Sequence, residues 1–198
     1  MERKLNAKEQ VLKLTSMAVL AGISVVVVLF SFPIIPGYAF LEYDAADVFI
    51  LLAGLLFGWA AGVEVLIVAA AVQALTVSAG SGWMGFIMHM AATSALVLTA
   101  CLTHDKLLRK PPQLPLCLAL GCIAMIAVMI PANLIIMPLF TGAPREMVVK
   151  ALIPAIIPFN AIKAGANSVL AGILYFAILP ILRKTPINAI LKAEVKQY

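Results

Sequence analysis

The sequence predicts an all-α integral membrane protein with six transmembrane helices in a single membrane domain, residues 1–198. Composition is the first observation: 64% of the residues are hydrophobic, 12% are charged and the mean hydropathy is +1.09. A soluble domain is about 45–50% apolar and about 25% charged. The second observation is that apolar runs recur along the whole chain. Because one span needs about 20 apolar residues, 198 residues leave no room for a separate soluble domain.

Six apolar runs, bounded by charged residues, proline or glycine, define the predicted helices. The first run resembles a secretory signal peptide, but its apolar part is too long and no small-x-small cleavage site follows, so we expect it to remain as a helix. The short string "FGWAAG" predicts a tight hairpin between the second and third helices, and the proline-containing segment 32–44 predicts an extended outer loop. The predicted helices cover residues 10–31, 45–59, 61–79, 83–106, 113–140 and 159–183.

Prolines determine where the sixth helix begins. A single helix over residues 147–183 would be about 55 Å long at 1.5 Å per residue, whereas the bilayer core is about 30 Å thick. Proline lacks a backbone donor and clashes with the preceding turn, so we expect a break near Pro158 and a span that starts just after it. Asn160 and Lys163 then lie in the first turns of this helix, at a depth where a broken backbone is buried in protein or lines a cavity.

The distribution of charge predicts the topology. Six spans place both termini on one side, and loops rich in Lys and Arg are cytoplasmic. That side would carry Arg3, Lys4, Lys8, Lys13, Lys106, Arg109, Lys110, Arg183, Lys184, Lys192 and Lys196. The opposite loops would carry Arg145, Lys150 and Glu146, with Glu42, Asp44 and Asp47 facing outward. Because the net charge of +5 arises from these clusters at helix ends, the sequence does not predict nucleic-acid binding.

Three polar residues recur on one face of the sixth helix. Asn160, Lys163 and Asn167 have i, i+3, i+7 spacing, which aligns them along one side. They either let the lysine snorkel to headgroups while the amides join helices, or bind a polar, planar solute. Asn133, at similar depth in the fifth helix, favours the second interpretation. Trp83 is interpreted as an interfacial aromatic that could also stack on a ligand ring.

Patterns for catalysis and metal binding are sparse. The two histidines, His89 and His104, are predicted on opposite halves of the membrane and cannot form a metal pair. No Gly-Lys-Ser/Thr phosphate loop occurs, so no catalytic residue, metal or cofactor is predicted. Two alternatives stay open: an ion-coupled carrier that uses Glu64 as the coupling group, and a membrane enzyme that uses Ser81 with His89.

A small-residue face marks the first helix. Ala18 and Gly22 are four residues apart, with Ala21 beside them, a spacing that allows close helix approach. This face could pack within the bundle or against a partner.

Together these motifs resemble the substrate-binding S component of an energy-coupling factor (ECF) transporter, and most closely the riboflavin-specific S component. The resemblance covers essentially the whole chain, including "LEYDAADV", "FGWAAG" and "NLIIMPLF". Its most specific part is "IIPFNAIKAG", where Pro158, Phe159, Asn160, Lys163 and Gly165 match a Pro-Phe-Asn-x-x-Lys-x-Gly string. The family more often has alanine where this chain has Gly22.

The resemblance implies a six-helix fold, in the plasma membrane of a prokaryote, that binds riboflavin in a pocket open to the outside. Riboflavin would be a transported ligand and no cofactor is implied, although another vitamin is an alternative. Asn160 and Lys163 would bind the polar edge of the isoalloxazine ring, Asn133 would add an amide, and the 38–47 loop would help to cover the site.

The resemblance also implies partner subunits. A membrane T component and two cytoplasmic ATPases would drive release inward. Ala18, Ala21 and Gly22 would contact the T component through the small face of the first helix.

Overall fold

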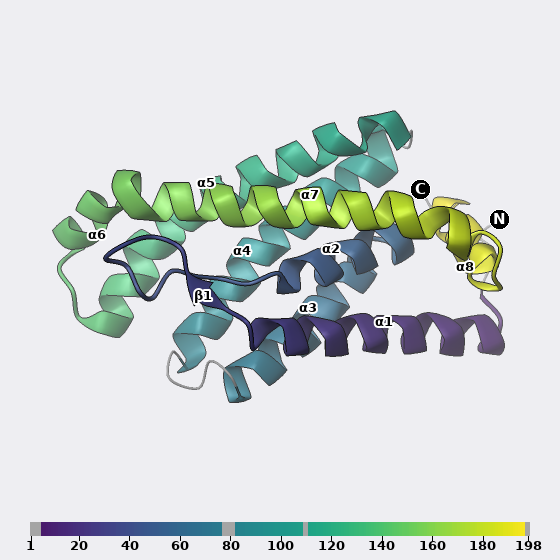
Figure 1. Cartoon of the computed structure of the whole chain (residues 1–198), viewed down its shortest axis with the longest axis horizontal. Helices are drawn as coiled ribbons and strands as arrows, with labels where there is room; N and C mark the ends of the chain where they lie inside the picture. The colour runs from purple at the N-terminus through teal and green to yellow at the C-terminus, as the bar shows by residue number, and fades with distance from the viewer. Residues whose placement is uncertain (1–4, 77–81, 109–110, 197–198) are drawn as a thin grey trace.

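The computed structural model describes residues 5–76, 82–108 and 111–196, which form an elongated, all-α bundle with one short β-ribbon (Figure 1). The beginning of α1 and the whole of α8 lie at one end of the bundle, and α6 lies at the other (Figure 1). The helices are α1 (Ala7–Val28), α2 (Ala46–Phe57), α3 (Trp59–Leu75), α4 (Gly82–Thr103), α5 (Leu114–Thr141), α6 (Arg145–Ala151), α7 (Ile157–Leu182) and α8 (Ile187–Lys196).

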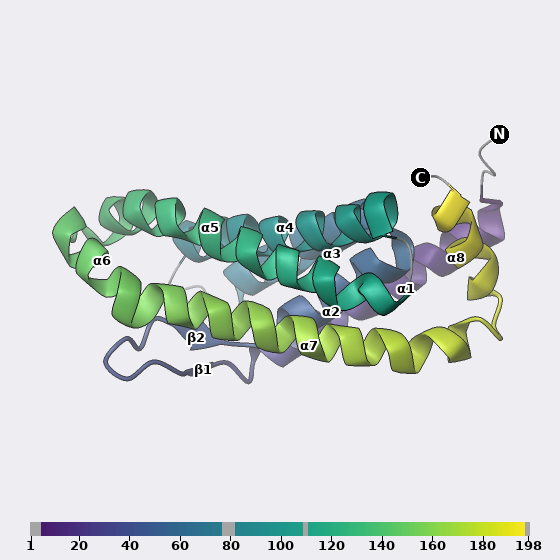
Figure 2. The same cartoon turned by 90° about the horizontal axis from the view of Figure 1, so that it is seen from above.

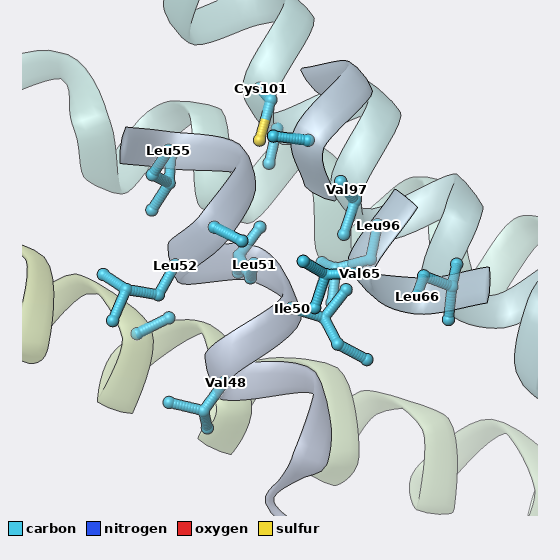
Figure 3. Packing of buried hydrophobic residues seen from close by; sticks show 14 of the residues in the cluster. Val48, Ile50, Leu51, Leu52, Leu55, Val65, Leu66, Leu96, Val97 and Cys101 are labelled. Atoms are coloured by element: carbon cyan, nitrogen blue, oxygen red, sulfur yellow. The ribbon is translucent and has the colours of Figure 1, made fainter. Parts of the chain in front are cut away.

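The short helix α2 forms the centre of the bundle. Its side chains are apolar on nearly every side, and it packs against α1, α3, α4, α7 and α8. Ile50 and Leu51 have no exposed surface, and Figure 3 shows them facing Val65 of α3 and Val97 of α4. A helix that is hydrophobic all round is stable only where other elements surround it, which explains this central position.

Length separates the helices into two groups. Within the described residues, four segments are long and apolar enough to cross a membrane: Ala7–Val28, Trp83–Lys106, Leu114–Thr141 and Arg145–Leu182. The helices α2 and α3 have 12 and 17 residues, and 12 residues extend only about 18 Å at 1.5 Å per residue. The all-α class is therefore confirmed, whereas six complete spans and the cytoplasmic placement of both termini stay predictions. Residues 77–79 of the predicted third helix lie outside the described residues.

Glycine makes the hairpin between α2 and α3 possible. Gly58 alone separates the two helices, and its φ of 89° lies in a region that favours glycine. Beyond the turn, Gly54 and Gly62 face each other, and a Cβ atom at Gly62 would lie 3.0 Å from the Cα atom of Gly54. The same Cβ atom would lie 2.7 Å from Cγ1 of Val97. Close approach of these helices therefore requires the absence of side chains.

The predicted extended loop folds into a ribbon, which we define as residues 32–43. Its strands β1 (Phe32–Pro33) and β2 (Glu42–Tyr43) pair antiparallel, with Phe32 opposite Tyr43. Leu41 of the ribbon packs with Ala155 and Phe159 in a small apolar cluster. These contacts hold the ribbon against the beginning of α7 (Figure 2).

The α-helix is interrupted just before Pro158 rather than after it, and the backbone remains helical through the interruption. A π-helical turn over Leu152–Ile156, which contains Pro154, connects the two helices. Pro158 lies in the first turn of α7, directly after this wide turn, and has no backbone N–H to donate to it. The helical segment from α6 to α7 is longer than a bilayer core requires, and the π-helical turn lets its direction change between the two helices.

The sequence analysis did not predict α8. This helix is amphipathic and buries Ile190 and Leu191 against the bundle. Lys13 of α1 forms an ion pair with Glu194, with 2.7 Å between Nζ and Oε1. Figure 2 shows α8 beside the first turns of α1. At 10 residues the helix is too short for the apolar-run criterion that identified the other helices.

The close contact between Gly54 and Gly62 predicts that even one added methyl group at this point lowers the stability of the fold. Gly62→Ala should lower the free energy of unfolding by about 1–3 kcal/mol, because the new methyl group overlaps the backbone of Gly54. Thermal unfolding in detergent would measure the effect. Gly22→Ala is the matched control, since a Cβ atom there meets nothing within 4 Å; equal unfolding midpoints for both variants would contradict the prediction.

Candidate functional site

A cavity of about 400 Å³ lies at the ribbon end of the bundle, between the ribbon, α3, α4, α5 and α7. Its volume falls in the range of small-molecule pockets. Asn133, Asn160 and Lys163 line it. A larger cavity, of about 680 Å³, lies at the opposite end beside α8, and none of the predicted ligand-binding residues reaches it. The chemistry of the side chains therefore identifies the smaller cavity as the candidate site.

Methionine and phenylalanine form much of the cavity wall. Thioether side chains are flexible and polarisable, and they pack well against aromatic rings. Phe159 of α7 and Phe40 of the ribbon add aromatic surface. Such a wall suits a flat apolar face. The methionines that line the cavity are Met84 and Met88 of α4 and Met125, Met129 and Met137 of α5.

Two asparagines provide a matched pair of polar groups in this cavity. Asn133 and Asn160 are 4% and 2% exposed. Each Nδ2 donates to the carbonyl oxygen four residues earlier in its own helix, at 2.8 Å, which is Met129 in one case and Ile156 in the other. This bond fixes the orientation of each amide. Each amide has a second N–H and a side-chain carbonyl oxygen, and neither group has a partner among the described residues.

Lys163 is held by a buried carboxylate. Its Nζ donates to Oδ2 of Asp44 at 2.7 Å, and the two side chains are only 12% and 6% exposed. The amine thus turns into the bundle, so the snorkelling interpretation is wrong. A buried lysine without an opposite charge would be strongly unfavourable. The ammonium group keeps further N–H donors for a ligand.

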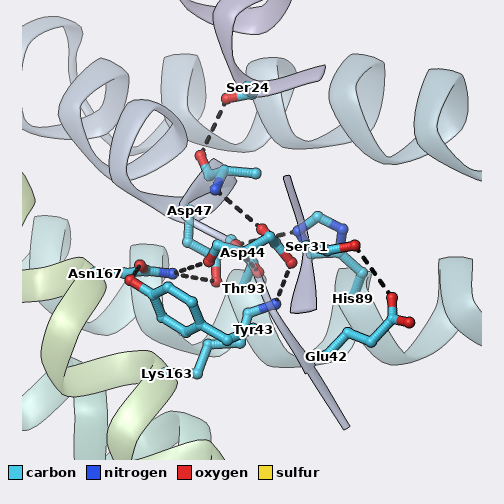
Figure 4. Close-up of polar contacts among 11 residues, drawn as sticks. Ser24, Ser31, Glu42, Tyr43, Asp44, Asp47, His89, Thr93, Lys163 and Asn167 are labelled. Carbon is cyan, nitrogen blue, oxygen red and sulfur yellow. Dashed lines mark hydrogen bonds and ion pairs between the residues drawn. The ribbon is translucent and has the colours of Figure 1, made fainter. Parts of the chain in front are cut away.

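A second carboxylate, Asp47, connects three helices (Figure 4). Its side chain is fully buried. Oδ1 accepts a hydrogen bond from Thr93 at 2.7 Å and lies 3.1 Å from Nε2 of His89, so it joins α2 to α4. Oδ2 accepts from Nδ2 of Asn167 of α7 at 3.3 Å. Both oxygens of the buried carboxylate thus have hydrogen-bond partners, and Asp47 holds α2, α4 and α7 together.

Asn167 serves this network and does not line the cavity. Its Oδ1 accepts a hydrogen bond from the hydroxyl of Tyr43 at 2.9 Å, and its Nδ2 also donates to the backbone oxygen of Asp44 at 3.1 Å. Burial raises the pKa of the Tyr43 phenol, and the charge of Asp44 raises it further. The phenol is therefore protonated at neutral pH and acts as a donor. Asn167 thus fastens the ribbon to α7.

The 38–47 loop was expected to cover the site, but its acidic residues were expected to face outward and not to be buried partners within it. Glu42 is exposed, as expected of an outer loop, but Asp44 and Asp47 are buried. Two signals in the sequence could have indicated them. Carboxylates beside an apolar helix are unfavourable unless they are paired, and Lys163 required a partner of opposite charge.

Two other predicted residues, Trp83 and Glu64, do not line the cavity. Trp83 is 54% exposed and contacts Phe140 edge-to-face, with ring centroids 5.6 Å apart. Glu64 is exposed on α3 and lines neither cavity. Ser81 lies outside the described residues. His89 does line the cavity, where it faces Asp47.

Of the three small residues predicted to form one face of α1, the structure buries one and exposes two. The buried side of α1 includes Ala21, together with Met17 and Ser24. Ala18 and Gly22 are exposed on the outside of the bundle. Only these two residues are therefore available to a partner without rearrangement.

The fold and the site define a membrane-embedded bundle with an internal cavity for a small molecule. The family of ECF transporter substrate-specific components matches residues 12–175. The chain belongs to this family, and the predicted resemblance is confirmed at that level. The protein is therefore a transport component and not an enzyme. Its ligand is a transported substrate, not a cofactor, and its family implies a T component and ATPases as partners.

A solved structure agrees with this assignment. The chain is similar to the S component of a bacterial ECF transporter, with a TM-score of 0.78 and 28% sequence identity. The similarity covers 88% of this chain and 99% of the other. Comparison with curated proteins finds no match.

The hydrogen bond from Tyr43 to Asn167 yields a stability prediction. Tyr43→Phe should lower the free energy of unfolding by about 1 kcal/mol, because the amide loses a partly buried partner. Tyr38→Phe is the control, since Tyr38 is also half-buried in the ribbon and its hydroxyl makes no hydrogen bond among the described residues. Thermal unfolding in detergent would compare them. A Tyr38 variant that is as destabilised as the Tyr43 variant would show that this hydrogen bond contributes nothing.

Proposed function

We propose that this S component binds riboflavin with high affinity and takes it up across the plasma membrane of a prokaryote. In this proposal the chain has six spans with both termini in the cytoplasm. The observation that carries the proposal is the arrangement of Asn133, Asn160 and Lys163 in one cavity whose wall is otherwise rich in methionine. The sequence resemblance to riboflavin-specific S components supports the same ligand.

The chemistry of the cavity suits an isoalloxazine ring. The ring has two apolar aromatic faces, which the thioethers and Phe159 can cover. Its polar edge carries carbonyl oxygens, ring nitrogens and an N–H group. The two amides can both donate and accept hydrogen bonds, and Lys163 can donate. A few polar groups in an otherwise apolar pocket orient such a ligand and discriminate against other shapes.

The ribbon would act as the cover of the site. Phe40, Leu41 and Glu42 of the ribbon line the cavity, while Leu41 also packs against α7. A ligand that enters from the outside would pass this segment. The contacts that hold the ribbon to α7 would then enclose the bound molecule.

Energy for uptake would come from partner subunits, because the sequence has no nucleotide-binding motif. The exposed positions Ala18 and Gly22 support a contact between α1 and the T component, since small residues permit close helix packing in a membrane. Exposed Val11 and Leu14 extend the same apolar side of α1 toward its N-terminal end. Ala21 is assigned to internal packing.

The test is an absorption and fluorescence spectrum of the protein, expressed in riboflavin-containing medium, purified in detergent and washed. A near-stoichiometric flavin band with quenched emission would support the proposal. A colourless protein that also fails to bind added riboflavin would overturn it and redirect the search to other vitamins.

Asn160 provides the most direct test of the cavity. Asn160→Ala should weaken riboflavin binding by about 1–3 kcal/mol, because a polar group of the ring would lose its partner in a desolvated site. Quenching of riboflavin fluorescence during titration measures the dissociation constant. Asn188→Ala, which removes an amide from the cavity at the opposite end, is the control. Unchanged binding in Asn160→Ala would remove this part of α7 from the site.

The face of α1 can be tested separately from ligand binding. Gly22→Leu should leave riboflavin binding intact and block uptake in cells that contain the partner subunits, because the larger side chain would separate α1 from the T component. Val169→Phe, which adds volume at an exposed position of α7, should permit uptake. Loss of binding in Gly22→Leu would instead indicate that this face packs inside the protein.

A further inference from the structure

We infer that the cavity selects an uncharged ligand, and that Glu42 and Asp44 make it reject anionic relatives such as the 5′-phosphate of the same flavin. This inference rests on the proposed function and adds the specificity of the site. Glu42 lies in β2 of the ribbon, Asp44 lies in the segment that joins the ribbon to α2, and both line the cavity.

Among the described residues, the charged groups of the wall leave no uncompensated cation for an anionic ligand. Lys163 already pairs with Asp44 at 2.7 Å, so the positive charge is compensated inside the protein. Glu42 accepts a hydrogen bond from Ser31 at 3.2 Å and forms no ion pair with a described residue. His89 faces Asp47 at 3.1 Å, and this carboxylate offsets any positive charge on the imidazole. The wall is therefore negative overall.

The pair between Lys163 and Asp44 is also preformed. Oδ1 of Asp44 accepts a hydrogen bond from the backbone N–H of Ala46 at 3.0 Å, and its backbone oxygen accepts one from Asn167 at 3.1 Å. These two hydrogen bonds fix the position of Asp44 independently of Lys163. An anionic ligand that replaced Asp44 as the partner of Lys163 would leave Asp44 buried without a counter-charge, which is strongly unfavourable.

A neutral ligand avoids this conflict. An ammonium group has three N–H donors, so Lys163 can donate to a ring carbonyl while it remains bonded to Asp44. A phosphate group, in contrast, would add a charge of about −1.5 to −2. Glu42, which has no ion-pair partner among the described residues, would repel this charge more strongly than in bulk water, because the cavity walls have a low dielectric constant.

The experiment measures the ratio of two dissociation constants, for riboflavin 5′-phosphate and for riboflavin, with the full-length protein in detergent. We expect a ratio of at least about ten in the unmodified protein, and a lower ratio at high salt because ions screen exposed Glu42. Glu42→Gln should reduce the ratio by about three- to tenfold, the effect of one charge at a partly solvated distance. Glu64→Gln, an exposed carboxylate outside both cavities, should leave it unchanged.

A second variant addresses the buried pair. Asp44→Asn would leave the charge of Lys163 uncompensated and should favour the phosphate over riboflavin relative to the unmodified protein. If this variant does not fold, the Glu42→Gln comparison still decides the question. Equal affinities for the two ligands, or a ratio that Glu42→Gln does not change, would overturn the inference while riboflavin binding stands. Failure of riboflavin itself to bind would instead overturn the proposed function, and the inference with it.

Discussion

The ion pair between Lys163 and Asp44 is the interaction on which the end of the molecule that contains the candidate site depends. A lysine amine buried among helices requires an opposite charge, and the chain supplies it from the segment between β2 and α2. That segment must therefore stay close to α7. Through this pair the ribbon, the beginning of α2 and the polar face of α7 become one structural unit, and the cavity forms beside it.

The network around Asp47 extends this unit to the other helices. Asp47 lies in the first turn of α2 and reaches Thr93 of α4 and Asn167 of α7. On the opposite side of α2, the buried hydroxyl of Ser24 in α1 donates to the backbone oxygen of Ala46 at 3.1 Å. Figure 4 shows these contacts converging on the beginning of α2. The buried side of α1 and the cavity are thus linked through a short series of hydrogen bonds.

The polar groups near the cavity divide into those that bond within the protein and those that keep hydrogen-bonding capacity toward the cavity. Asn167 uses both ends of its amide within the protein, whereas Asn133 and Asn160 use one N–H each and line the cavity. The methionine wall gives the cavity an adaptable apolar surface. This division allows the network to hold its geometry while the remaining groups stay available to the proposed ligand.

The sequence by itself determined the membrane class, the approximate place of the main helices and the alignment of Asn160 and Lys163 on one face. These properties follow from composition and from the helical repeat, both of which are local. Family membership was also accessible, because the motif around Lys163 is contiguous in the chain. A short amphipathic helix such as α8 escaped the same reasoning because it lacks a long apolar run.

Only the tertiary structure decided which groups meet. Lys163 and Asp44 are 119 residues apart in the sequence, and the methionines of the wall come from two different helices, so no local pattern encodes either arrangement. The same holds for α1, where packing against the bundle buries Ala21 and exposes Gly22. The central position of α2 likewise depends on the helices that surround it. Contacts of this kind are selected by the burial of whole faces and by the pairing of charge, and these are properties of the assembled bundle.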